Sequence, residues 1–208
     1  MLFPDVYVTK FFFKAGLAST PGSLLELGCG NGNNARLFAE YGWTITGIDM
    51  SAEGLAAARS NWSGEPVDSW SFIERDLRQG LPPLEGSFDA LIANGSLYYF
   101  ERSYLTALLE ETRSVLAPGA RVYFKFRTPE DWRYGKGREV ERNTFQLEID
   151  ETGECGATMA FYTPDDLCQL LDATIGPLVD RQVLLESHQN VQNSVLVDNR
   201  DVIVWGRI

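Results

Sequence analysis

The chain has 208 residues, of which 44% are apolar and 23% are charged, and its formal net charge is −11. This length fits one domain with a single sizeable core, and the composition is typical of a globular protein. The acidic balance argues against a general nucleic-acid binder, and the lack of an uninterrupted apolar run of about 18 residues argues against a membrane partner.

Short apolar runs alternate with amphipathic segments in the first 127 residues, and Gly or Pro separates many of them. Apolar spacing and capping residues predict helices at 5–17, 33–41, 52–60 and 103–116, the last stopped by Pro118-Gly119. The apolar runs predict buried strands at 23–27, 44–49, 71–76, 88–94 and 121–127. This alternation predicts an α/β fold, with a doubly wound and mostly parallel sheet covered by helices on both faces.

The second half departs from this alternation. Residues 145–149 and 157–161 each alternate apolar with polar side chains, and "ETGE" lies between them, which predicts an inserted β-hairpin. Thr163 and the acids after it predict the start of another helix, and 180–187 and 201–208 predict two closing strands joined by a loop of ten to fifteen residues. We expect one domain over 1–208, with 128–162 as a lid or substrate insertion.

Three glycines, Gly28, Gly30 and Gly32, follow the first strand directly and precede a helix. Glycines at this point let a ligand approach the main chain, where the helix offers unpaired N–H groups. The spacing is GxGxG, and Asn33 stands where the dinucleotide fingerprint GxGxxG has its third glycine. The motif predicts a nucleotide-like ligand and disfavours the usual dinucleotide.

Acidic residues stand at the ends of three successive predicted strands: Glu26, Asp49 and Asp76. Glu26 would repel a pyrophosphate but suits a cationic ligand, and Asp49 is placed to accept from both hydroxyls of a ribose. Together the three acids predict a ligand with a ribose, hydrogen-bond donors and positive charge.

The ordered set "ELGCGNG", "GIDMS", "ERDL" and "FDALIAN" resembles the class I methyltransferases that use S-adenosylmethionine. The resemblance covers roughly residues 7–127 and, more loosely, the final strand pair. It implies a seven-stranded sheet with the order 3-2-1-4-5-7-6, whose last strand is antiparallel. It also implies transfer of a methyl group to an acceptor.

Carried over by position, the resemblance assigns cofactor contacts to nine residues. Glu26 would meet the amino group of the cofactor, and Asp49 the ribose hydroxyls. Met50 would lie against the adenine, while Asp76 and the Leu77 backbone would meet its exocyclic amine. The remaining contacts, all with the methionine part, fall on Gly28, Cys29, Gly30 and Asn94. Tyr7 and Lys10 match the pattern only weakly.

Catalytic residues are less marked. Tyr98 follows the fourth strand, where relatives face the acceptor, and His188 lies near the loop before the last strand, so both are candidates. Each also has a structural interpretation, as a core aromatic residue and as a solvated histidine. The expected acceptor is a small molecule with an oxygen or nitrogen nucleophile. The basic stretch with Arg127, Arg133, Lys136 and Arg138 would suit an anionic or sugar-linked acceptor, unless it is only a mobile loop of mixed charge.

Two other functions stay open. A non-catalytic subunit that binds the cofactor is compatible with the lack of a decisive base, and an NAD-dependent oxidoreductase uses a similar sheet. Cys29, Cys155 and Cys168 are widely spaced beside a single histidine, so we expect neither disulfides nor a metal site. The start "MLFPDV" lacks the pattern of a secretory signal, and we expect a cytoplasmic protein.

Overall fold

The computed structural model describes residues 3–64 and 66–208, and its largest element is a seven-stranded sheet. The strand order β3-β2-β1-β4-β5-β10-β9 confirms the expected topology, with β9 and β10 as the two closing strands. The first five strands pair in parallel, and β10 pairs antiparallel with both β5 and β9. The strands are β1 (Ser23–Leu27), β2 (Thr44–Asp49), β3 (Trp70–Glu74), β4 (Phe88–Asn94), β5 (Leu116–Arg127), β9 (Val179–Gln192) and β10 (Val195–Arg207).

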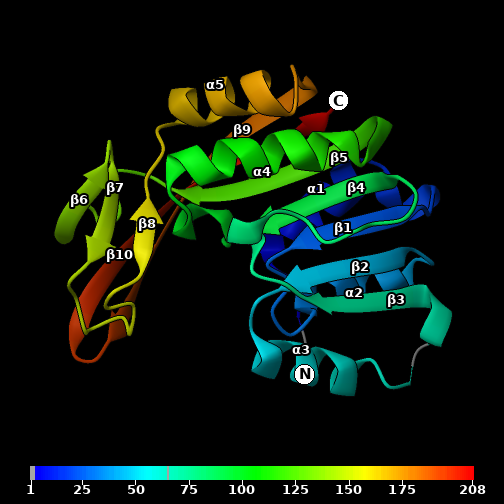
Figure 1. Cartoon of the computed structure of the whole chain (residues 1–208), viewed down its shortest axis with the longest axis horizontal. Coiled ribbons are helices and arrows are strands. Elements are labelled where there is room, and N and C mark those ends of the chain that lie inside the picture. The colour runs from blue at the N-terminus through cyan, green and yellow to red at the C-terminus, as the bar shows by residue number, and fades with distance from the viewer. Residues whose placement is uncertain (1–2, 65) are drawn as a thin grey trace.

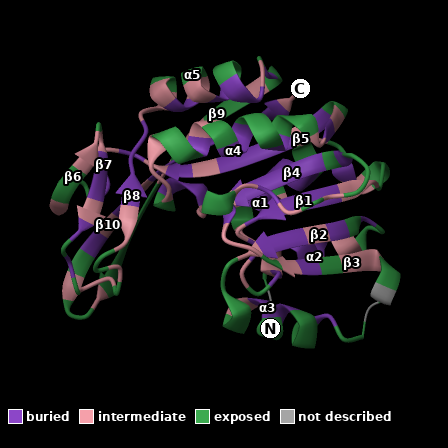
Figure 2. Cartoon of the chain, in the orientation of Figure 1, coloured by how far each residue is buried: buried purple, intermediate pink, exposed green. Residues whose placement is uncertain are grey.

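Helices cover both faces of this sheet (Figure 1). α1 (Val6–Lys14), α2 (Asn33–Glu40) and α3 (Ala52–Asn61) bury apolar residues in one core cluster. α4 (Arg102–Ser114) and α5 (Pro164–Thr174) bury theirs in a second cluster on the opposite face. The central strands β1 and β4 are almost continuously buried, whereas the edge strands β3 and β9 are largely exposed or half-buried (Figure 2). No helix in the described part of the chain is long and apolar enough to cross a bilayer.

Side-chain caps fix the starts of three helices, as local sequence predicts. The Asp5 carboxylate accepts from the first turn of α1, the Ser51 hydroxyl accepts from Gly54 N in α3, and the Thr163 hydroxyl accepts from Asp166 N in α5. The end of α4 differs from the prediction. The helix stops at Ser114, and Pro118-Gly119 lie in the first part of β5, where its register with β4 shifts.

The insertion between β5 and α5 is a separate three-stranded antiparallel sheet, drawn apart from the main sheet in Figure 1. Its strands are β6 (Gly137–Glu141), β7 (Thr144–Leu147) and β8 (Thr158–Ala160). The pairing of β7 with β8 matches the expected hairpin. β6 was not expected, because its five residues are polar except for Val140 and carry no apolar alternation.

The expected loop between the closing strands is wrong. β9 and β10 continue as one long hairpin that turns at Asn193 and Ser194, both with positive φ. The polar run after Glu186 hides the strand pattern, but tertiary contacts hold it in place. Thr128 N donates to Arg200 O and Trp132 N donates to Asp198 O, so the far end of the hairpin binds to the insertion.

Candidate functional site

The glycine loop joins β1 to α2 at the carboxyl end of the sheet. Gly28 has a φ of 74°, and a Cβ built there would lie 2.2 Å from Ser96 Cβ, so no other residue fits without displacement. The Ser96 hydroxyl donates to Leu27 O at 2.6 Å and thereby packs the turn after β4 against the loop. A Cβ on Gly30 would meet nothing within 4 Å, so this stretch of main chain is open to a ligand.

Glu26 is the most unusual acid of the site, because its side chain is buried at the end of β1, with an exposed fraction of 1%. Oε1 accepts from Asn34 Nδ2 at 3.0 Å, and Oε2 makes no close hydrogen bond among the described residues, although the main-chain N–H of Ala35 lies near enough to the carboxyl to favour its charged form. Burial in a low-dielectric setting disfavours the charged form and raises the pKa of this carboxyl to about 8. An unpaired buried carboxyl oxygen fits a ligand that brings a hydrogen-bond donor or a cation.

Asp49, the last residue of β2, binds the glycine loop through its carboxylate. Its Oδ2 accepts from Gly30 N and its Oδ1 from Ser51 N, both at 2.8 Å. These two bonds fix the carboxylate at the end of β2 and leave lone pairs for further donors, such as a pair of hydroxyl groups. Met50 beside it is 61% exposed, and both residues line the cleft described below.

Asp76 lies at the next strand end but is already engaged. The Arg78 guanidinium forms a bidentate ion pair with it, at 2.8 Å between Nη2 and Oδ2, and these hydrogen bonds lower the pKa of the Asp76 carboxyl. An adenine amine would therefore share this carboxylate with Arg78. One clue to this pair is visible in the sequence, since Arg78 follows Asp76 by only two positions, in what proves to be a tight turn.

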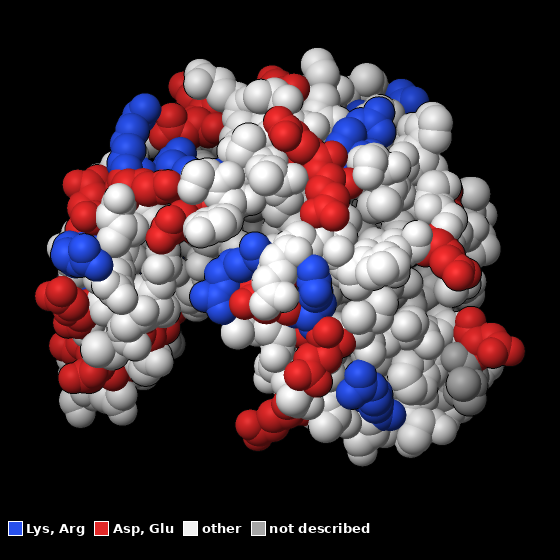
Figure 3. Space-filling view, in the orientation of Figure 1, with Lys and Arg blue, Asp and Glu red and all other residues white. Residues whose placement is uncertain are grey.

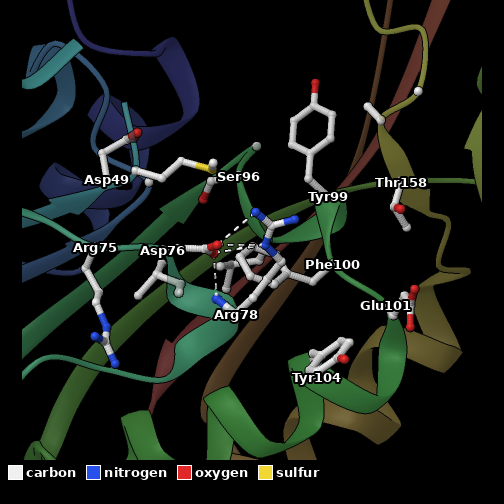
Figure 4. Close-up of a pocket in the computed structure, with 17 residues that line it drawn as sticks. Asp49, Arg75, Asp76, Arg78, Ser96, Tyr99, Phe100, Glu101, Tyr104 and Thr158 are labelled. Atoms are coloured by element: carbon white, nitrogen blue, oxygen red, sulfur yellow. Dashed lines mark hydrogen bonds and ion pairs between the residues drawn. The ribbon is translucent and has the colours of Figure 1, made fainter. Parts of the chain in front are cut away.

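A cleft of about 780 Å³ runs along this edge of the sheet, between the strand ends and the insertion (Figure 4). Five of the predicted cofactor residues line it: Gly28, Asp49, Met50, Asp76 and Leu77. The sequence did not single out several others, among them Arg75, Arg78, Ser96, Glu101, Tyr104 and Thr158. Three short segments, after β3, after β4 and at the start of β8, thus meet at one cavity. Because they are far apart in the sequence, the sequence alone does not show that they meet.

The four other predicted cofactor residues do not line the cleft, but each is within two positions of Gly28 or Gly95, which do: they are Glu26, Cys29, Gly30 and Asn94. Asn94 ends β4 and its Oδ1 accepts from the Tyr123 hydroxyl at 3.2 Å, while the following Gly95 lines the cleft. Cys29 is buried, and burial raises the pKa of its thiol. This agrees with a filler role for its side chain and leaves only its main chain to face a ligand.

The neighbouring tyrosines of the 3-10 turn η4 (Leu97–Tyr99) point to different places. Tyr98 is buried, its ring lies 5.4 Å from the Arg127 guanidinium, and burial raises the pKa of its hydroxyl. Tyr99 instead lines the cleft (Figure 4), and its hydroxyl donates to Glu154 Oε1 of the insertion at 2.8 Å. The structure brings Tyr99, and not Tyr98, to the cleft wall.

His188 also lies away from the cleft wall. It is a residue of β9 rather than of a loop, and its side chain is about half exposed. Its Nδ1 is 3.8 Å from Glu186 Oε1. The expected loop beside His188 is absent here, because 188–192 pair with β10.

The basic segment is neutralised within the protein. Arg127 lies 3.0 Å from Asp201 and 3.3 Å from Asp131, and Arg133 pairs with Asp131 and Glu154. Arg138 is exposed and donates to Gln146, and Lys136 lies over the Trp132 ring. Arg127 is the last residue of β5, and Arg133 lies buried in the turn that follows it. Figure 3 accordingly shows acidic and basic side chains intermingled on this face, without a broad basic patch.

The chain is similar in sequence to known methyltransferases. A family model described as a methyltransferase domain matches residues 24–119. The chain is 27% identical over 134 residues to an uncharacterized methyltransferase of Synechocystis, covering 64% of this chain and 60% of that protein. It is 33% identical over 103 residues to trans-aconitate 2-methyltransferase of Paracidovorax citrulli, covering 49% of this chain and 37% of that protein.

Among solved structures, an S-adenosylmethionine-dependent methyltransferase of Methanosarcina mazei superposes with a TM-score of 0.67 at 18% identity, over 99% of both chains. Likeness at this identity shows a shared fold. The chain spans less than two thirds of the length of the curated relatives named above.

Proposed function

We propose that this chain is a class I S-adenosylmethionine-dependent methyltransferase and that it transfers a methyl group from S-adenosylmethionine to a small-molecule acceptor. The observation that carries the proposal is the pairing of Glu26, whose buried Oε2 lacks a partner, with the open main chain at Gly30. A ligand that combines an ammonium group with hydroxyl and amine donors satisfies both. Bound there, S-adenosylmethionine supplies a methyl group on a sulfonium centre with a good leaving group.

The residues at the strand ends divide the binding of this cofactor between them. Glu26 accepts from the ammonium group, and Asp49 accepts from the ribose hydroxyls. Met50 and Leu77 flank the adenine ring, whose exocyclic amine donates to Asp76. The rest of the methionine part lies along main chain, at Gly28, Cys29, Gly30 and Asn94. The residues present therefore fit the group.

The acceptor occupies the part of the cleft between η4 and the insertion, which Tyr99, Tyr104 and Thr158 line. The charged side chains of the cleft wall are Asp49, Asp76 and Glu101 against Arg75 and Arg78, which leaves one negative charge in excess. Because Arg127 and Arg133 are already paired, this balance favours a neutral acceptor over an anionic one. The reacting nucleophile is an oxygen or a nitrogen.

The contribution of the protein to the chemical step is alignment and exclusion of water. Orienting two reactants can lower a barrier by about 7–11 kcal/mol in the best intramolecular models. The insertion 128–162 supplies the outer wall, held by the Tyr99–Glu154 hydrogen bond and by apolar residues of β7 and β8 in the α4/α5 core. Neither Tyr98 nor His188 touches the cleft, so their catalytic roles would require movement. A neutral amine acceptor would need no strong base.

Calorimetry and turnover test the proposal in two steps. S-adenosylhomocysteine should bind, NADH should not, and Glu26→Gln or Asp49→Asn should weaken binding by about 1.5–3 kcal/mol, as expected for a lost charge-assisted hydrogen bond. The exposed Glu53→Gln on α3 is the matched control. Incubation with methyl-labelled cofactor and a panel of small amines, phenols and carboxylates then measures transfer. Folded protein that binds neither the donor nor its demethylated product would contradict the assignment.

A further inference from the structure

The sheet has two edges, and they differ sharply. β3 at one edge has five residues, whereas β9 at the other has fourteen. Within the described residues no strand pairs with the outer side of β9, which leaves a row of main-chain N–H and C=O groups. Natural proteins usually protect such an edge with short strands, Pro, Lys or bulges. β9 contains no Pro, Gly or Lys, and its pairing with β10 is irregular only near its start, opposite Trp205 to Arg207.

The side chains along this edge are also unusual. Val183 and Leu185 lie opposite Val204 and Val202 of β10, so they share the face covered by α4 and α5. Yet they are 43% and 69% exposed. The helices therefore reach over β10 but leave the outermost aliphatic residues uncovered. Figure 1 places β9 at the margin of the sheet beneath α5.

The charges of the edge strand are occupied internally. Arg181 forms an ion pair with Asp172 of α5, and Glu186 forms one with Lys125 of β5 at 2.6 Å. Both turn toward their own subunit and so offer little repulsion to a strand that approaches the edge. The centre of β9 is thus a run of three aliphatic residues, 183–185, flanked by charged residues that are already paired.

From these features we propose that β9 pairs antiparallel with β9 of a second copy of this chain, about a two-fold axis at Leu184. A two-fold axis perpendicular to the sheet keeps the faces of the two copies in common, so only residues on the same face can lie opposite each other. In this register Val183 of each copy lies opposite Leu185 of the other copy, and Leu184 of one copy lies opposite Leu184 of the other. The result is a continuous sheet through two subunits.

Neighbouring registers fit less well. An axis at Leu185 places Leu184 opposite Glu186, and an axis at Val183 places Arg181 opposite Leu185. An axis at Glu186 would put two like charges in contact. With the axis at Leu184, Gln182 faces Glu186 and Arg181 faces Ser187, both of which are compatible hydrogen-bonding pairs. Among these four registers, the edge is most self-complementary with the axis at Leu184.

The interface is distinct from the methyl-transfer cleft, because no β9 residue lines that cavity. Sedimentation velocity of the full chain across the micromolar range tests it. The wild type should form a concentration-dependent dimer, and Leu185→Lys should weaken it about tenfold or more, because each dimer would bury two unpaired ammonium groups. Leu196→Lys is the matched control, since Leu196 is 56% exposed but lies on β10 near the turn, outside the pairing.

Cross-linking fixes the register. In a Cys155→Ser background, which removes an exposed thiol, Val183→Cys and Leu185→Cys chains should form disulfides rapidly when mixed and slowly when separate. Directly opposite Cβ atoms are about 4.5–5.5 Å apart, which a disulfide can bridge with little movement. A wild type that stays monomeric throughout the range would overturn the proposal. So would equal effects of the two lysine variants, or Leu185→Cys chains that cross-link as fast alone as in the mixture.

Discussion

The buried carboxyl of Glu26 makes the strongest quantitative prediction, because its pKa is raised from 4.5 to about 8 in the folded chain. Between these values the folded protein keeps a proton that the unfolded chain has released. The folded-state pKa is the higher one, so the stability associated with this group is complete below pH 4.5 and is lost as the pH rises to about 8. The shift corresponds to a total of about 5 kcal/mol.

Cofactor binding should reverse the preference of Glu26 for its protonated form. An ammonium group at Oε2 stabilises the carboxylate, so binding near neutral pH must release the proton of Glu26. With a pKa of about 8, the ionised fraction rises about tenfold between pH 6 and pH 7, and the affinity should rise by the same factor. At pH 7 each binding event should release about 0.9 proton. The Glu26→Gln variant should show neither effect.

Isothermal titration calorimetry with S-adenosylhomocysteine measures both quantities. The observed enthalpy at pH 7 should differ between phosphate and Tris buffers by about nine tenths of the difference in their ionisation enthalpies, whereas it should not differ for Glu26→Gln. Urea unfolding of the cofactor-free protein should show the variant more stable than the wild type at pH 8. Glu53→Gln, on an exposed face of α3, should leave all of these unchanged. Affinity that is flat from pH 6 to pH 7, with no buffer dependence, would refute the reasoning.

Three further substitutions, the first with a matched control, test the packing and the cleft. Gly28→Ala should destabilise the protein by about 2–4 kcal/mol in urea unfolding, because its Cβ would meet Ser96, whereas Gly86→Ala, at a similar φ but with open space, should cost about 1 kcal/mol. Asp201→Asn removes a buried partner of two cations and should cost about 3–5 kcal/mol, measured in the same way. Tyr99→Phe loses its hydrogen bond to the insertion and should raise KM for the acceptor severalfold, with cofactor affinity in calorimetry unchanged.

The parts of the fold that could be predicted are those where local and tertiary signals agree. Strands β1, β2 and β4 are buried apolar runs, and turn or cap residues mark both of their ends. The acids at strand ends could be found because parallel strands bring their carboxyl ends to one edge. Position along a strand then suffices to place Glu26 and Asp49 near each other, and Gly30 N does bond to Asp49.

The parts that could not be predicted depend on contacts between distant segments. β6 and the outer half of β9 are polar strands whose pairing is stabilised by their neighbours rather than by their own pattern. Likewise, the basic segment looked available for an anionic ligand. Its arginines are matched by Asp201, about 70 positions away, and by Glu154. Nothing local to Arg127 announces that partner.

Tyr98 and Tyr99 show that distant contacts can decide the roles of two adjacent residues, which the sequence alone does not distinguish. Both residues belong to one 3-10 turn, in which successive side chains point about a third of a turn apart. Arg127, fixed by Asp201 on β10, lies over the Tyr98 ring and favours its burial, while Glu154 of the insertion accepts from the Tyr99 hydroxyl. Which tyrosine meets the acceptor is therefore decided by a strand and an insertion that come later in the chain. Exchanging either anchor should alter acceptor selection before it alters cofactor binding.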